Sequence, residues 1–308
     1  MAEDTSNSDW ALITRLNKDL RDSASLLGRK EARYLVDLYY SVQEQRQRSA
    51  SQVRAGEDQE PHALTLWLFD QFHVLEGDMK RALGVYANAH VPGVWAQTIH
   101  GIGPVIAAGL LAHIDVEPWR CTRPIKGKPC NPNDPHLEGS FQKQPCGYQA
   151  VHTAGGVWRF AGLDPTLKWE KGKKRPWNAA LKRLCWIIGD SFRKQRNSPK
   201  DHYGKVYESR KELELVKNEQ GDYARLAEET LKEKNITDKE LKKTYESGRL
   251  PAGRIELRCM RYATKLFISH YHHVAHETHF SQPPPNPYVI EHLGHTKYLS
   301  PPNWPMSN

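Results

Sequence analysis

The chain of 308 residues has no apolar run that approaches the roughly 20 residues a membrane-spanning helix needs. Its first ten residues, MAEDTSNSDW, lack the basic and apolar pattern of a secretory signal. It has only five cysteines, an odd number, and none forms a CxxC pair. These absences argue against a membrane protein and against a secreted disulfide scaffold. We therefore expect a cytoplasmic protein without a membrane partner.

Recognisable metal-binding motifs are also missing. Cys121, Cys130 and Cys146 lie in one loop-rich stretch with His136 and His152 nearby. Their spacings of nine and sixteen residues differ from the close ligand pairs of zinc sites. We predict no metal and no cofactor, and zinc at these three cysteines stays an open alternative.

Hydrophobic periodicity predicts an all-α fold. Apolar residues recur at alternating spacings of three and four from Arg29 to about Gln43 and from Ala63 to Tyr86. The segment between these helices is polar, which predicts a long antiparallel hairpin of the coiled-coil type. Further helices are expected from near Pro176 and over residues 254–279.

The last of these helices carries a narrow apolar seam. Its members repeat every three or four residues, as in a coiled coil: Leu257, Met260, Thr264, Phe267, Tyr271 and Val274. Together with the small residues at 107–109, which permit close helix approach, the seam predicts a two-fold homodimer, with an internal core contact as the alternative. Histidines crowd the end of this helix, and without an HExxH motif we expect a surface histidine cluster rather than a metal site.

Positive charge is concentrated in one segment. The segment from Lys168 to Arg196 contains ten cationic and two acidic residues. Its net charge of ten minus two equals the formal net charge of the whole chain, +8. Trp169, Trp177 and Trp186 lie within this segment. Cations neutralise phosphates and flat rings stack on unpaired bases, so the segment predicts a nucleic-acid groove. The alternative is a solvated basic helix with Trp186 in the core.

A second binding element is predicted in TIHGIGPVIAAGLLAHI, residues 98 to 114. Gly101 and Gly103 allow a tight turn and Pro104 suits the first turn of a helix. This helix-hairpin-helix-like turn could direct backbone N–H groups at a phosphate. The predicted RNA- and DNA-binding residues are therefore His100, Gly101, Gly103, Arg159, Lys168, Trp169, Lys171, Lys173, Lys174, Arg175, Trp177, Asn178, Lys182, Arg183, Arg193, Lys194 and Arg196.

Composition divides the chain into four expected parts. Residues 1–94 are expected to hold the N-terminal helices and the hairpin, and residues 95–198 the nucleic-acid-binding domain, with a loop insertion at 115–150. Residues 199–253 are rich in charges of both signs and predict a peripheral helical arm. Residues 254–308 combine the last helix with a proline-rich strap.

The order of several motifs resembles a known family. GIGPVIAAGLLAHI, then WRFAGLDP, then a basic hinge and NAALKRLCWIIGDSF, is similar to the C-terminal domain of insertion-sequence transposases guided by a bridge RNA. The likeness covers about residues 95–196 and the final helix. In that family the domain is a helical, Nop-like module, similar to the coiled coil and Nop domain of box C/D ribonucleoproteins.

The chain differs from the transposases in two respects that change the function we expect of it. Their N-terminal RuvC-like strand pattern is missing, and Thr166 and its neighbours stand where a nucleophilic serine would follow the AGLxP element. The chain thus resembles the nuclease-free Tas proteins of tandem-interspaced-guide-RNA systems. This resemblance implies a homodimer that holds a short guide RNA, presents it to target DNA and is not itself an enzyme. A transposase-type strand-transfer enzyme and a structural RNA-binding scaffold are the alternatives.

Overall fold

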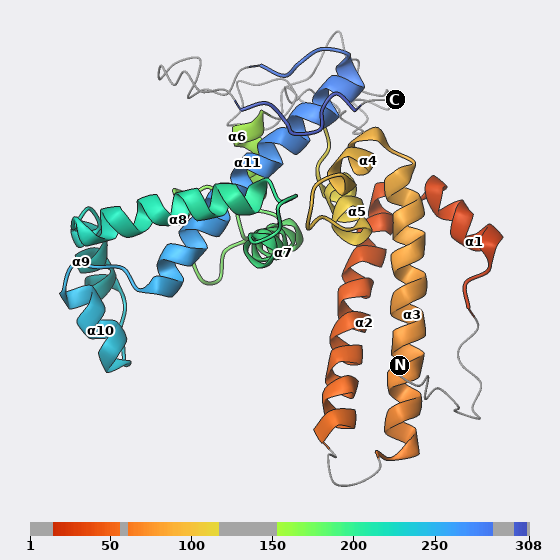
Figure 1. Ribbon diagram of the computed structural model, residues 1–308, viewed down its shortest axis with the longest axis horizontal. Coiled ribbons are helices and arrows are strands. Elements are labelled where there is room, and N and C mark those ends of the chain that lie inside the picture. Colours follow the sequence, from red (N-terminus) through yellow and green to blue (C-terminus); the bar gives the residue numbers. More distant parts are fainter. Residues whose placement is uncertain (1–14, 56–60, 117–152, 286–298, 307–308) are drawn as a thin grey trace, which may run out of the picture. The chain divides into compact units, whose positions relative to one another are not determined.

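The computed structural model describes residues 15–55, 61–116, 153–285 and 299–306 (Figure 1). Over these ranges the protein consists of α-helices, one short 3₁₀ helix and no strand, which confirms the predicted all-α class. None of the helices described is both long and apolar enough to span a bilayer. The chain forms two compact units. Unit 1 holds the described residues up to Gln97 together with Gly103–His113, and unit 2 holds Thr98–Ile102 and those from Ile114 onward.

Unit 1 is built around a long helical hairpin. Its elements are α1 (Lys18–Asp22), η1 (Ser23–Leu26), α2 (Arg29–Ala55), α3 (Ala63–Asn88), α4 (Val91–Gln97) and α5 (Pro104–His113). Helices α2 and α3 run antiparallel along most of their length (Figure 1). The predicted hairpin is thus present, and α5 begins at Pro104 as predicted.

Helix α2 is longer than its apolar periodicity predicted, because it continues twelve residues beyond Gln43 to Ala55. Polar contacts stabilise this extension in place of an apolar stripe. Arg46 and Gln43 donate hydrogen bonds to Glu76 on α3, and Arg48 pairs with Glu44 one turn earlier. A helix can therefore extend beyond its apolar stripe when polar side chains contact a neighbouring helix.

Close packing around α5 makes the core of unit 1. Ala107 and Ala108 have no exposed surface, and α5 packs against α2, α3 and α4. In α4, a Cβ at Gly93 would lie 2.2 Å from the carbonyl oxygen of Ala87, so only glycine fits there. The small residues at 107–109 serve this internal packing. Their predicted use in a contact between two copies was wrong, since no surface remains for it.

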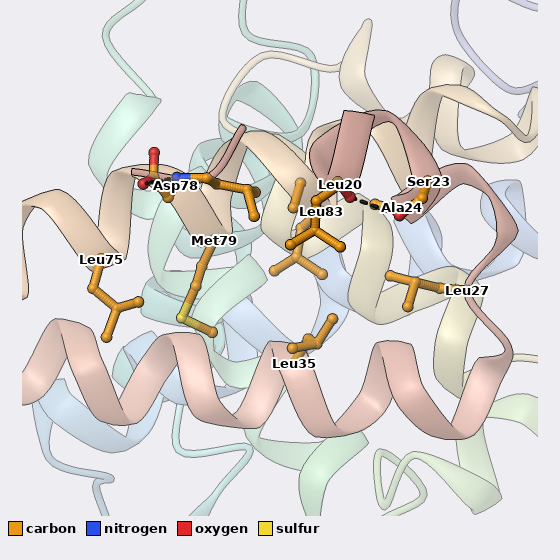
Figure 2. Close-up of a pocket in the computed structure, with 11 residues that line it drawn as sticks. Leu20, Ser23, Ala24, Leu27, Leu35, Leu75, Asp78, Met79 and Leu83 are labelled. Atoms are coloured by element: carbon orange, nitrogen blue, oxygen red, sulfur yellow. Dashed lines mark hydrogen bonds between the residues drawn. The ribbon is translucent and has the colours of Figure 1, made fainter. Parts of the chain in front are cut away.

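An apolar pocket of about 360 Å³ lies between α1, η1, α2 and α3 (Figure 2). Leucine side chains dominate its lining, with Met79 and Leu83 from α3. Asp78 stands at its edge, where its carboxylate accepts a hydrogen bond from the Leu16 amide and pairs with Arg81. The carboxylate therefore already has partners within unit 1.

Unit 2 is organised around its longest helix. Its elements are α6 (Ala154–Phe160), α7 (Ala179–Gln195), α8 (Tyr203–Glu219), α9 (Ala224–Glu233), α10 (Lys239–Glu246) and α11 (Ala252–Phe280). Helices α6, α7 and α8 all pack against α11. At the centre, the ring of Phe267 lies 5.4 Å from Phe192 and 5.2 Å from Tyr203, both edge to face.

Helix α8 is part of this core. Tyr203 and Tyr207 are almost fully buried, and the Tyr203 hydroxyl lies 2.7 Å from Nδ1 of His270. The prediction that residues 199–253 form a peripheral arm was wrong for α8. The many charged residues of this segment led to the wrong prediction. Two tyrosines four residues apart bury their rings, and the hydroxyl of one of them is hydrogen-bonded.

The apolar seam of α11 is likewise internal. Phe267, Tyr271 and Val274 are each at most 1% exposed within unit 2, whereas Leu257 is 49% exposed. The predicted homodimer contact along the seam was wrong, because α7 and α8 already cover it. The expected surface histidine cluster was also wrong for His270, His272 and His276, which are buried, while His279 is exposed.

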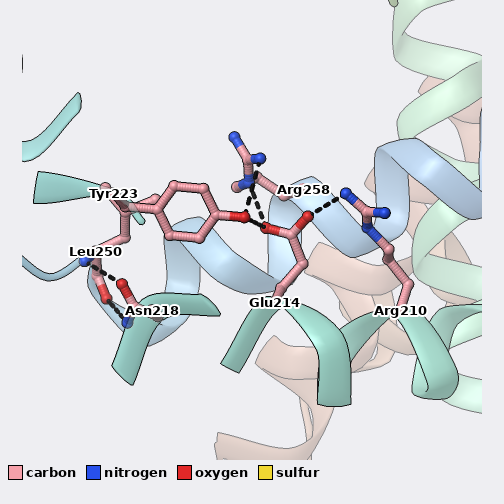
Figure 3. A network of polar contacts seen from close by, with 6 residues as sticks. All are labelled: Arg210, Glu214, Asn218, Tyr223, Leu250 and Arg258. Atoms are coloured by element: carbon pink, nitrogen blue, oxygen red, sulfur yellow. Dashed lines mark hydrogen bonds and ion pairs between the residues drawn. The ribbon is translucent and has the colours of Figure 1, made fainter. Parts of the chain in front are cut away.

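A buried polar network ties α8 to α9 and α11 (Figure 3). The Glu214 carboxylate is 1% exposed and accepts hydrogen bonds from Arg210, Arg258 and the Tyr223 hydroxyl at 2.5 to 2.6 Å. One turn further, Asn218 pairs with both backbone groups of Leu250. Asn218 therefore fixes the loop before α11, and Glu214 joins α8 to Arg258 on α11.

The described end of the tail contacts α11 and the turn before α5. The Leu299 carbonyl accepts from His270, and the Trp304 indole donates to Glu277 at 2.8 Å. Asn303 donates to the carbonyl oxygen and the hydroxyl of Thr98. These contacts agree with the predicted strap over residues 299–306.

Candidate nucleic-acid interface

The basic loop before α7 folds around one tryptophan. The Trp169 indole donates to the Lys173 carbonyl at 2.7 Å, and the Arg175 guanidinium lies 5.4 Å from the centre of its ring. Lys173 also pairs with Glu170 at the surface. Trp169 remains 42% exposed, and the loop presents its cations to solvent: Lys168, Lys171, Lys173, Lys174 and Arg175. Exposed cations around a partly exposed ring are suited to a polyanion with unpaired bases.

Helix α7 begins three residues later than the predicted start at Pro176, and it places the next part of the surface. The side-chain oxygen of Asn178 accepts from the Leu181 amide as the N-cap. Asn178 was predicted to bind RNA or DNA, but its oxygen is used for this cap. One turn further along α7, the Lys182 ammonium lies 3.9 Å from the centre of the Trp177 ring.

Two cations of α11 that the sequence interpretation did not select belong to the same surface. The Lys265 ammonium lies 4.1 Å from the centre of the Trp158 ring, and the Trp158 indole donates to the Lys265 carbonyl. Arg261 lies one turn earlier on α11 and is exposed. Its charge contributes to the lowered pKa values of Lys182 and Lys265, so it lies near both. We call Arg175, Lys182, Arg261 and Lys265, with Trp158 and Trp177, the cation–indole cluster.

Partial burial and neighbouring like charges lower the pKa of two lysines in this cluster. Partial burial, followed by the charges of Arg261 and Arg175, lowers the pKa of Lys182 below its usual value. Partial burial also lowers the pKa of Lys265, and Arg261 adds to the effect while Asp164 opposes it. Like charges held together at a partly desolvated surface are stabilised by a bound anion. The cluster therefore has the electrostatics of a phosphate-binding surface.

The cations at the other end of α7 are neutralised within the protein. Arg193 and Lys194 both pair with Asp190 at 2.7 Å, and Arg196 lies 3.6 Å from Glu208. The pKa of the Asp190 carboxyl stays below its usual value despite partial burial, because these two cations hydrogen-bond to it. These predicted binding residues therefore carry less uncompensated charge than the cation–indole cluster.

The turn glycine adjoins this second end of α7. Gly101 adopts a φ of +90° and its carbonyl accepts from Ser191, while His100 lies 3.1 Å from Gln195. A Cβ at Gly101 would lie 2.9 Å from the Ser191 hydroxyl, so the conformation and the space both favour glycine. The structure thus groups His100 and Gly101 with the neutralised end of α7 rather than with the cluster.

Four other predicted residues have different surroundings. Gly103 belongs to unit 1, where a Cβ would meet no atom within 4 Å. Arg159 is exposed on α6 at 3.8 Å from Asp164, and Arg183 is exposed on α7. In the same part of unit 2, Lys168 lies 3.7 Å from the exposed Glu233.

Trp186 departs from the alternative that placed it in the core. It is 56% exposed on α7, whereas Leu181, Leu184 and Ile188 on the same helix are buried. The Trp186 ring is therefore accessible to solvent on a basic helix.

Thr166 has a neighbour that the sequence interpretation did not identify. Its hydroxyl donates to the Asp164 carboxylate at 2.7 Å, and its backbone amide donates to the same oxygen at 2.9 Å. These bonds lower the pKa of the Asp164 carboxyl, which makes it a weaker base. Both hydrogen bonds to Asp164 are typical of a turn.

No protein-family model, curated protein or solved structure matches this chain. The interface is therefore characterised by its own geometry.

In the part of the chain that the structure describes, no three His, Cys, Asp or Glu side chains lie close enough together to hold a metal ion. Cys121, Cys130 and Cys146, and nearly all of the 115–150 insertion, lie outside the described residues. Cys185 and Cys259 are buried, and burial raises the pKa of their thiols to about 12 and about 11. Both are poor nucleophiles and poor metal ligands at neutral pH.

Proposed function

We propose that this protein is a cytoplasmic nucleic-acid-binding protein that holds a short guide RNA and presents it to target DNA without cutting it. The cation–indole cluster is the observation that carries the nucleic-acid part. It combines cations of lowered pKa from α7 and α11 with two indole rings that hold them in place. Such a surface binds phosphates through charge and leaves sequence selection to base pairing.

The guide-RNA part rests on the resemblance of the motif order to guided systems. Within the proposal the protein recognises backbone shape and charge, and the RNA recognises the target. A second copy of the chain is part of the proposal, through a surface other than the α11 seam.

Sequencing the nucleic acid that co-purifies with the protein expressed from its own locus tests the function. We expect short RNAs of defined ends whose variable segments match DNA. A structured RNA without such segments would instead support the scaffold alternative, and protein free of nucleic acid would contradict both. Mass measurement of the same sample tests the homodimer.

A further inference from the structure

Trp186 occupies an edge of α7 that runs beside α11. Lys182, Trp186 and Arg193 are spaced by four and seven residues, so their side chains follow one line along the helix. Gly189 lies on the same edge, and a Cβ there would come within 3.2 Å of Met260 and within 2.8 Å of Thr264. The exposed indole therefore borders the contact between the two helices.

Along α11, an exposed leucine is followed by an exposed arginine. Leu257 is 49% exposed, and Arg261 follows it one turn later. The charge of Arg261 contributes to the lowered pKa of Lys182, and the charge of Glu256 contributes to the raised pKa of Arg193, so these residues of α7 and α11 are near one another. Trp186 thus lies one turn after Lys182 on α7, next to the cation–indole cluster.

We propose that Trp186, on α7 next to the cation–indole cluster, forms a platform on which an unpaired base of the bound nucleic acid stacks. The inference rests on the proposed nucleic-acid-binding function. An indole face accepts any base, and cations one turn away neutralise the phosphates of the same strand. Trp158 and Trp177 suit this role less well, because a cation of the protein already covers each ring. The neighbouring positive charge favours a nucleic acid over an apolar protein partner.

Binding of two labelled RNAs to the full chain tests the platform. One is a single strand of about 20 nucleotides without self-complementarity, and the other is a perfect duplex of equal length. Stacking on an aromatic side chain contributes about 1–3 kcal/mol per base. We therefore expect Trp186→Ala to weaken single-strand binding about 5- to 150-fold, to leave duplex binding unchanged, and to keep the salt dependence of wild type.

Two variants serve as controls. Trp186→Phe keeps an aromatic face and should retain most of the affinity. Trp67→Ala removes another partly exposed tryptophan, on α3 of unit 1, and should bind both RNAs as wild type does.

Three results would overturn the platform. Equal binding by Trp186→Ala and wild type, or equal losses for single strand and duplex, would remove the stacking role. A change of mass in Trp186→Ala with RNA affinity retained would assign the patch to a protein contact. If wild type bound neither RNA, the proposed function would fail with it, so the two failures are distinguishable.

Discussion

The Lys182 ammonium rests over the Trp177 ring, 3.9 Å from its centre, beside the turn at Gly162. Gly162 has a φ of +66°, and a Cβ there would lie 2.9 Å from both side chains. The turn, the ring and the helix therefore fix the position of this cation before any ligand binds. A preorganised cation loses less side-chain entropy on binding a phosphate.

The basic loop provides the first prediction. Replacing Lys171, Lys173, Lys174 and Arg175 by alanine should flatten the salt dependence of single-stranded RNA binding. Each lost phosphate contact changes the slope by about 0.7, so four contacts give a change of up to about 3. Fluorescence anisotropy over a range of salt concentrations measures this slope.

A matched control removes the same charge elsewhere. Lys217, Lys239, Lys242 and Lys243 are exposed on α8 and α10, and their replacement by alanine also subtracts four charges. If both variants changed the slope equally, net charge rather than the basic loop would govern binding.

The burial of Phe267 provides the second prediction. Phe267→Ala should lower the free energy of unfolding by about 3–5 kcal/mol, because a ring packed on Phe192 and Tyr203 leaves a cavity. Phe267→Glu should abolish the cooperative unfolding transition of unit 2. Leu257→Glu, at the exposed end of the same seam, should melt close to wild type. Folded, monomeric Phe267→Glu would restore the interface interpretation.

Glu214 provides a prediction about pH. Burial alone would raise the pKa of its carboxyl, but hydrogen bonds from Arg258 and Tyr223 outweigh burial and hold the pKa below its usual value of 4.5. The stabilisation is therefore fully present above about pH 4.5 and is lost as pH falls through the lowered pKa. Glu214→Gln should cost on the order of 3 kcal/mol at pH 7 and show a smaller further loss in acid.

Denaturant unfolding between pH 3 and 7 measures this difference. Glu212→Gln, at an exposed position on α8, provides the control and should follow wild type throughout. A Glu214→Gln variant as stable as wild type at pH 7 would show that the network contributes nothing.

Periodicity was sufficient to predict the helices that bury an apolar stripe. Helices α3 and α11 begin and end within two residues of the predicted bounds, and α2 begins at Arg29 as predicted. The second half of α2 was missed because polar contacts, including the ion pair of Arg46 with Glu76 on α3, stabilise it in place of an apolar stripe. The burial of α8 was missed because Tyr203 and Tyr207 belong to a segment that is otherwise rich in charged residues.

The sequence predicted only part of the interface, because some of its residues are far apart along the chain. The basic run at 168–196 was evident from the sequence, whereas Arg261 and Lys265 come about eighty residues after Lys182 and reach it only through packing of α11 on α7. Arg193 and Lys194 lie three and four residues after Asp190, so helical spacing could have shown that they share this carboxylate. Local sequence thus indicates the cations and their partners on one helix, and tertiary contacts add the cations of α11.

Catalysis provides the fourth prediction. We expect the purified protein with its RNA and magnesium to leave target DNA intact, because the carboxyl beside Thr166 has a lowered pKa and is a weak base. Denaturing gel electrophoresis of end-labelled DNA measures this. RNA-dependent nicking that disappears in Thr166→Ala would support the strand-transfer alternative instead.

Recognition of DNA through the bound RNA is the central claim, and one measurement tests it most directly. The protein purified with its own RNA is mixed with two labelled DNAs, one complementary to the variable segment of that RNA and one with the same composition in scrambled order. We predict at least a hundredfold preference for the complementary DNA, since a mismatch costs about 1–3 kcal/mol and a scrambled target contains many. Equal binding of the two DNAs would contradict RNA-guided recognition.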